Sequence, residues 1–186
     1  MYKTVLFDLD GTLLNTIDDL ADSANRVCAA HGWPQHETAQ YRYFVGNGIP
    51  KLVERFSPAE CRSPEQLAAT LAEFDKVYGA HMHDKTAPYP GIPELLARLK
   101  AAGVRMAVFS NKADALAKEV VKDYFGTQYF TIVRGQMTGV APKPAAEGTN
   151  ALLQTLHADP ASTLYVGDSN VDVETAHNAN LPCCGA

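Results

Sequence analysis

The stretch TVLFDLDGT, residues 4–12, decides the fold of this chain. An apolar strand is predicted to run into Asp8 and Asp10, and Gly11 follows them. Because side chains alternate along an extended strand, both carboxylates point to the same side, while the glycine lets the chain turn away without a Cβ clash. The two acids can then face one reacting atom. Asp and Gly are also the commonest residues of ordinary turns, so a plain strand-ending turn remains the alternative for this stretch alone.

Three further polar clusters each follow an apolar segment that is predicted to be a strand. The segment MAVF leads into SNK, residues 110–112, and the segment TLYV leads into GDSNVD, residues 167–172. Lys143 stands between two prolines after a third segment of this kind. In open α/β sheets, ligands bind outside the carboxyl ends of the strands, so polar residues gathered there converge on one crevice. We therefore expect the four clusters to form one site.

These four motifs resemble those of the haloacid dehalogenase superfamily, and most closely those of its phosphoglycolate phosphatase-like members with an inserted helical cap. The first motif of that family, D-x-D-G-T, is matched by residues 8–12, and its second, a Ser or Thr after a strand, by Ser110. The third, a single Lys, is matched by Lys143, and the fourth, G-D-S-x-x-D, by residues 167–172. The resemblance covers essentially the whole chain. Each motif alone has low specificity, but four in the family's order are strong evidence.

The resemblance implies a mechanism in which Asp8 attacks phosphorus and forms an aspartyl-phosphate, which water then hydrolyses. Asp10 would protonate the departing alkoxide and later take a proton from that water. A halide leaves without a proton and the dehalogenase branch has no Asp here, so Asp10 favours hydrolysis of a phosphate ester. Ser110 and Asn111 would bind the non-bridging oxygens, and Lys143 would supply positive charge to the transition state.

Some of these residues also have simpler explanations. Ser110 would serve as the N-cap of the helix predicted to begin soon after it, and it can combine both roles. Lys143, taken alone, would be a solvated lysine in a loop. Thr12 completes the first motif and is assigned to substrate binding together with Asn111.

A magnesium ion is the cofactor that the resemblance implies. A phosphate ester repels nucleophiles through its own negative charge, and Mg²⁺ needs only one or two carboxylates besides waters and a phosphate oxygen. Asp8 and Asp168 are the predicted carboxylate ligands, and the resemblance adds the backbone carbonyl of Asp10. Asp172 lies one helical turn beyond Asp168, where it would orient a bound water or Lys143.

Domain organisation follows from the long, mostly helical segment between the first two motifs, which is too long for one crossover. We expect an α/β core of residues 1–15 and 87–186, with a Rossmann-like parallel sheet flanked by helices. Residues 16–86 would form an inserted all-α cap domain. Since the core recognises only the phosphate, the cap would choose the substrate.

One loop of the predicted cap is a candidate for contact with the leaving group. Gly46 and the two residues after it, Asn47 and Gly48, lie between two predicted helices, and Lys51 follows shortly. The family uses a loop of this region to contact the leaving group, so Asn47, Gly48 and Lys51 are predicted to bind substrate. A simple turn between helices is the alternative for each of them.

Composition excludes several other classes of protein. The 186 residues are 46% hydrophobic and 20% charged, with a net charge of −5, which argues against a nucleic-acid surface. No apolar run approaches the length of a membrane span, and the start does not resemble a signal peptide, so we expect a cytoplasmic protein. The four cysteines form no C-x-x-C pair and no zinc pattern, which indicates reduced thiols. A small phosphorylated metabolite is the expected partner, for a monomer or a homodimer.

Three functions remain open at this point. The favoured one is a Mg²⁺-dependent phosphatase acting on a small phosphorylated metabolite such as 2-phosphoglycolate. A sugar phosphomutase of β-phosphoglucomutase type shares the motifs but keeps its phosphoenzyme from water. A receiver-like signalling module also combines an acceptor Asp, Mg²⁺, a hydroxyl residue and Lys in a parallel α/β fold, but it has no inserted cap and needs no acid at Asp10.

Overall fold

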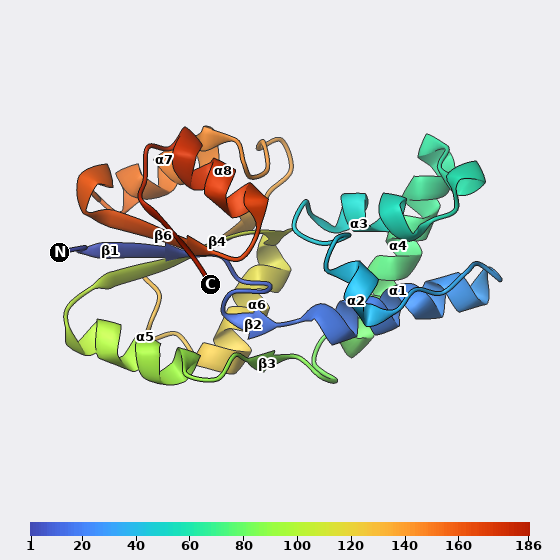
Figure 1. Cartoon of the computed structure of the whole chain (residues 1–186), viewed down its shortest axis with the longest axis horizontal. Coiled ribbons are helices and arrows are strands. Elements are labelled where there is room, and N and C mark those ends of the chain that lie inside the picture. The colour runs from blue at the N-terminus through green and yellow to red at the C-terminus, as the bar shows by residue number, and fades with distance from the viewer. The chain divides into compact units, whose positions relative to one another are not determined.

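A computed structural model describes all residues, 1–186, and divides them into two compact units. The first, here called the α/β unit, consists of Met1–Leu14 and Pro88–Ala186, and the second, the helical unit, of Asn15–Ala87. Both divisions fall one residue from the boundaries expected from the sequence. Figure 1 shows the chain coloured from its N-terminus to its C-terminus.

The α/β unit contains a five-stranded sheet with the order β5-β4-β1-β6-β7, in which every neighbouring pair is parallel. The predicted parallel sheet is thus confirmed, with the strand before Asp8 at its centre. A central parallel strand is buried on both faces, which explains why all four residues of β1 are buried. The strands are β1 (Thr4–Phe7), β4 (Arg105–Ala113), β5 (Ile132–Gln136), β6 (Thr163–Gly167) and β7 (Cys183–Gly185).

Helices cover both faces of this sheet, with α7 and α8 on one face and α5 and α6 on the other (Figure 1). Leu6 and Tyr165 point from the sheet into a buried cluster that also includes Leu152 of α7 and Ala176 of α8. Fully burying a side chain such as Leu contributes about 1.5–3 kcal/mol, so this cluster holds the site-bearing strands in place. The helices are α5 (Ile92–Ala101), α6 (Asp114–Phe125), α7 (Ala146–Thr155) and α8 (Asn170–Asn178).

Strand β4 differs from its prediction because it continues through Ser110 and Asn111 to Ala113. Its pairing with β5 shifts register between Phe109 and Ala113, so these polar residues occupy an irregular part of the strand instead of a following loop. Helix α6 begins only at Asp114, with Ala113 at its N-cap. The explanation of Ser110 as a helix N-cap is therefore wrong.

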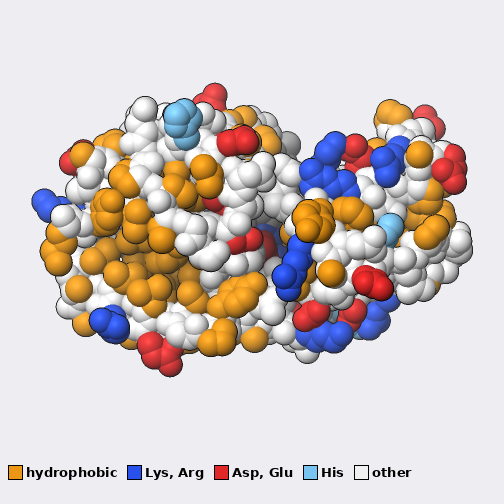
Figure 2. All heavy atoms as spheres, viewed as in Figure 1, with side chains coloured by type: hydrophobic (Ala, Val, Ile, Leu, Met, Phe, Trp, Pro, Cys, Tyr) orange, Lys and Arg blue, Asp and Glu red, His pale blue; other side chains and the backbone are white.

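Strand β7 forms one edge of the sheet, and all three of its residues are exposed. Apolar side chains gather on the face of the α/β unit that is turned to the viewer in Figure 2. Leu95 of α5 and Val173 of α8 are among the exposed large hydrophobic residues.

In the helical unit, buried aromatic residues join α4 to α3. Phe74 of α4 lies 5.9 Å from Phe56 and 5.6 Å from Tyr78, measured between ring centroids. The short strands β2 (Leu14–Asn15) and β3 (Ala87–Pro88) pair where the chain leaves and re-enters the α/β unit. The helices are α1 (Ile17–Ala30), α2 (Thr38–Tyr41), α3 (Ile49–Phe56) and α4 (Pro64–His81), and short 3₁₀ turns lie at Ala59–Cys61 and, in the α/β unit, at Pro160–Ser162. None of the helices combines the length and hydropathy that crossing a membrane requires.

Candidate active site

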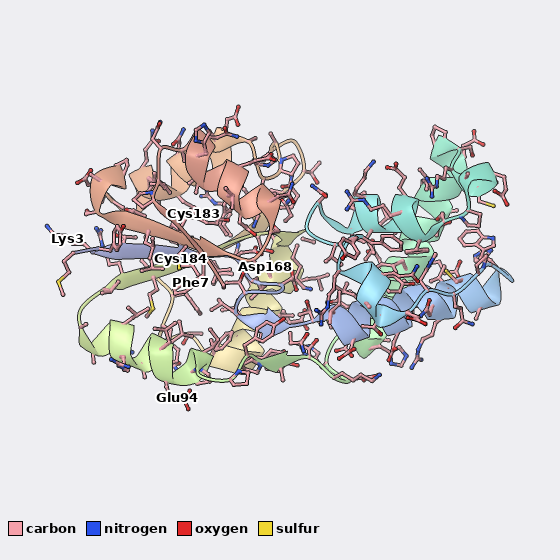
Figure 3. The ribbon with its side chains drawn as sticks, viewed as in Figure 1. Lys3, Phe7, Glu94, Asp168, Cys183 and Cys184 are labelled. Carbon is pink, nitrogen blue, oxygen red and sulfur yellow. The ribbon has the colours of Figure 1, made fainter.

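The first and fourth sequence motifs meet at the carboxyl ends of β1 and β6. Gly11 has a φ of 92°, and a Cβ at this position would collide with the carboxylate of Asp168. Figure 3 shows Asp168 at the end of the sheet opposite to Lys3, which precedes β1. A glycine is therefore required at position 11 by its backbone conformation and by the close approach of the second acidic motif.

Lys143 lies at the centre of the site and not in a solvated loop, so that alternative is wrong. Its side chain is 3% exposed, and its Nζ donates to Oδ1 of Asp8 at 2.6 Å and to Oδ1 of Asp172 at 2.7 Å. Asn111 holds the backbone of Lys143 from both sides, accepting from its N–H at 2.9 Å and donating to its carbonyl at 3.3 Å. A buried ammonium of this kind needs such carboxylate partners, because burying it unpaired is costly.

Burial and neighbouring charges together shift the pKa values of the groups in this cluster. Burial raises the pKa of Asp8 from 3.8 to about 7, although the neighbouring ammonium of Lys143 works in the opposite direction. Burial also raises the pKa of Asp168. For Asp172, burial is outweighed by Lys143 and by hydrogen bonds from Ser169, which together lower its pKa. Burial disfavours the charge of Lys143, yet the carboxylates of Asp8 and Asp172 outweigh this and raise its pKa well above its usual value.

Asp172 has its two carboxylate oxygens engaged by neighbouring side chains. Oδ1 accepts from Lys143 and, at 3.1 Å, from the hydroxyl of Tyr165, while Oδ2 accepts from the hydroxyl of Ser169 at 2.6 Å. Ser169 is also the N-cap of α8. Sequence reasoning assigned no role to Tyr165, because a Tyr in an apolar strand has the pattern of a core residue. Ser169 was identified as part of the fourth motif but was given no role, although S-x-x-D before a helix is the pattern of a capping box.

Asp10 and Thr12 each have one partner among the other motifs. The Nζ of Lys112 donates to Oδ1 of Asp10 at 3.3 Å, and the side chain of Lys112 is only 2% exposed. The hydroxyl of Thr12 donates to Oδ1 of Asp168 at 3.0 Å. Ser110 accepts a hydrogen bond at its Oγ from the backbone N–H of Lys112 at 3.1 Å. Lys112 stands two residues after Ser110, and nothing in the sequence indicates which acid it contacts.

Three carboxylates of this cluster, Asp8, Asp168 and Asp172, fit a divalent cation. Each offers an oxygen, and these atoms lie within 4.8 Å of one another. Oxygen ligands suit Mg²⁺, and a cation would offset the cost of holding Asp8 ionised in a buried position. The backbone carbonyl of Asp10, expected as a further ligand, stays a prediction.

The remaining predicted residues, Asn47, Gly48 and Lys51, lie in the helical unit. Oδ1 of Asn47 accepts from Arg55 at 2.8 Å, and Lys51 donates to Glu54 at 2.7 Å. Gly48 is the N-cap of α3 and has a φ of 84°. Their contact with a substrate stays a prediction.

Phosphoryl transfer is the chemistry that this arrangement suits, since positioning and charge stabilisation are most of what that reaction needs from a protein. The parallel sheet and the acidic site at the carboxyl ends of its strands define the class of this protein as a parallel α/β hydrolase. The chain belongs to the haloacid dehalogenase-like hydrolases, whose family model matches residues 5–186. The predicted resemblance is thus confirmed.

Known proteins of similar sequence and structure agree with this family. A phosphoglycolate phosphatase from Mesorhizobium japonicum is 34% identical over 96% of this chain and 79% of its own length. A solved structure described as a predicted phosphoglycolate phosphatase from Haemophilus somnus has a TM-score of 0.91 and 28% identity, over 99% of this chain and 84% of that one. The structure of CbbY from Rhodobacter sphaeroides in complex with phosphate has a TM-score of 0.80 and 26% identity, over 98% and 85%. The chain is accordingly an enzyme, a phosphoric monoester hydrolase.

Proposed function

We propose that this enzyme is a Mg²⁺-dependent phosphatase that hydrolyses a small phosphorylated metabolite through an aspartyl-phosphate on Asp8. 2-Phosphoglycolate is the first candidate substrate, because relatives at about one-third identity carry that activity in their names. The observation that carries the proposal is the buried contact of Lys143 with Asp8 at 2.6 Å. It places a fixed positive charge beside the carboxylate that would attack, where the charge of a phosphoryl group would also lie.

The residues for the metal follow from their other contacts. Asp8 and Asp168 would hold the ion with the backbone carbonyl of Asp10, since Asp172 already accepts from Lys143 and Ser169. Asp172 would then act mainly by orienting Lys143 or a water on the metal. When bound, the ion would neutralise phosphate charge and favour the ionised form of Asp8.

The steps of the reaction assign one task to each acid. Asp8 would form a bond to phosphorus while the bond from phosphorus to the ester oxygen breaks, and Asp10 would give its proton to that oxygen. In the second step, Asp10 would take a proton from the water that attacks the aspartyl-phosphate, which returns both acids to their first state. Lys143, Ser110 and Asn111 would contact the phosphoryl oxygens.

Selection of the leaving group would belong to the helical unit, acting as a cap. Asn47, Gly48 and Lys51 are the residues proposed to contact it. Cap closure would exclude water during the first step and admit it for the second.

A phosphate-release assay over a panel of metabolite esters, with and without Mg²⁺, tests this function. We expect release that requires the metal and is lost in Asp8→Asn. Glu94→Gln is the matched control, because this exposed carboxylate of α5 lies away from Asp168 (Figure 3). Release that survives in Asp8→Asn would refute the mechanism. Isomerised sugar phosphate without free phosphate would indicate the phosphomutase instead.

A further inference from the structure

Lys112 is a buried lysine at the site to which the mechanism above gives no task. It lies in β4, which pairs directly with β1, and its side chain is 2% exposed. The backbone of β5 packs closely against it, since a Cβ at Gly135 would collide with the carbonyl of Lys112. An ammonium group held this far from water needs a charged partner, and Asp10 supplies one.

We propose that Lys112 is a positioning residue for Asp10, holding one carboxylate oxygen so that the other faces the leaving group. This inference rests on the proposed function, in which Asp10 transfers the proton. The contact that supports it runs from Nζ of Lys112 to Oδ1 of Asp10, at 3.3 Å.

The chemistry of an ammonium group explains why this contact would order the acid. An ammonium group has three donors and no acceptor, so Oδ1 of Asp10 accepts from Lys112 whether or not the carboxyl group is protonated. The transferable proton is therefore on Oδ2. Without this contact, the side chain of Asp10, which is 25% exposed, would be free to turn and present either oxygen. Orientation of a reacting group contributes strongly to rate.

Lys112 and Lys143 hold different acids. Lys143 binds Asp8 and Asp172, whereas Lys112 binds Asp10. The loss of Lys112 is therefore expected to slow the first step only for esters whose leaving group needs a proton, and the loss of Lys143 to slow that step for every ester.

The variant Lys112→Met tests this inference, because the unbranched side chain of methionine keeps much of the volume of lysine. Its kinetics are measured with esters that have different leaving groups. We expect kcat/KM, which reports the first step, to fall about 10- to 100-fold for an alkyl phosphate, within the range of acid catalysis, and less than about threefold for p-nitrophenyl phosphate. The second step, in which Asp10 takes a proton from water, is common to both esters and affects kcat for both. Lys118→Met, which removes a lysine of α6 that is 57% exposed, is the matched control and should behave as the wild type.

A double-mutant cycle makes the test sharper. If Lys112 acts through Asp10, adding Lys112→Met to Asp10→Asn causes no further loss of kcat/KM for the alkyl phosphate. Losses that multiply, or an equal loss for alkyl and aryl esters, would overturn the inference. If Lys112→Met does not fold, as judged by its thermal unfolding, Lys112→Gln serves in the same cycle. The single variant Asp10→Asn distinguishes failure of this inference from failure of the proposed function. If Asp10 is not the acid, Asp10→Asn slows alkyl and aryl esters equally.

Discussion

Two lysines predicted to meet substrate, Lys143 and Lys51, have opposite surroundings. Lys143 is 3% exposed and donates to two carboxylates that lie 29 and 135 positions away in the chain. Lys51 is 44% exposed and pairs with Glu54, one helical turn further along α3. The chemical part of the site is thus fixed by long-range buried contacts, while the candidate specificity residue is held only locally. A substitution at Lys51 is therefore expected to leave the buried contacts of Lys143 undisturbed.

The same contrast appears in the backbone around the two lysines. Asn111 binds both the N–H and the carbonyl of Lys143. In the helical unit, Asn47 lies between Gly46 and Gly48, whose φ values are 98° and 84°. Positive φ is the region that glycine enters freely, so the path of this loop depends on its two glycines instead of on long-range contacts.

Lys143→Met is expected to have the largest effect of the variants that probe this comparison. It removes the positive charge beside Asp8 and leaves Asp8 and Asp172 buried without their cation. We expect kcat for all esters to fall by about 10³-fold or more, and the thermal midpoint to fall as well. Steady-state kinetics with several esters measure the first effect and thermal unfolding the second. A variant that keeps more than a tenth of the wild-type kcat would contradict the central role given to Lys143.

Asp10→Asn should have the next largest effect, and one that depends on the leaving group. Alkyl esters need a proton on the departing oxygen, so their kcat/KM should fall about 10²- to 10⁴-fold, whereas that of p-nitrophenyl phosphate should fall much less. Comparison of kcat/KM, which reports the first step, for the two ester classes is the measurement. Equal slowing of both would argue against Asp10 as the acid.

The main features of the fold and of the acidic site could be predicted because they depend on where parallel strands end. Asp8, Asp168 and Lys143 each follow an apolar strand or its connection, and parallel strands bring their carboxyl ends to one edge of the sheet. Pairing of particular lysines with particular acids could not be predicted. Lys112 reaches Asp10 because β4 lies beside β1, and this strand order is a tertiary property.

Two other features depend on tertiary packing, which local sequence patterns do not indicate. Tyr165 alternates with apolar neighbours, so nothing in the sequence distinguishes its hydroxyl, which contacts Lys143 and Asp172, from a core side chain. Ser110 precedes a helical pattern, yet the irregular pairing of β4 with β5 delays the helix until Asp114. In both cases, sheet pairing decided the outcome.

The pH dependence of stability probes the buried cluster without using activity. A carboxyl group whose pKa is raised by folding binds its proton more tightly in the folded chain, so its contribution to stability is lost as pH rises through the folded pKa. For Asp8 the window runs from 3.8 to about 7. In metal-free protein, the thermal midpoint should therefore fall by several degrees between pH 5 and pH 8.

Asp8→Asn, which cannot ionise, is the control for this effect and should remove most of the fall. Added Mg²⁺ should also reduce it in the wild type, since an ion that binds the ionised carboxylates stabilises the folded state. Calorimetry with chelator and with Mg²⁺ gives the measurement. If the thermal midpoint changes with pH equally in Asp8→Asn and in the wild type, Asp8 does not titrate in this range.

Lys51→Met should have the smallest effect, and it tests the other side of the comparison. Because Lys51 and Glu54 are both well exposed, their pair is screened by water and its loss should leave the thermal midpoint unchanged. If Lys51 contacts the leaving group, KM for the natural substrate should rise by less than about tenfold, as expected for one solvated charge, with kcat nearly constant. Kinetics at low and high salt measure this, because a surface charge acts less at high ionic strength. A large loss of kcat would mean that the helical unit takes part in the chemistry, and the division of tasks between the two units would fail.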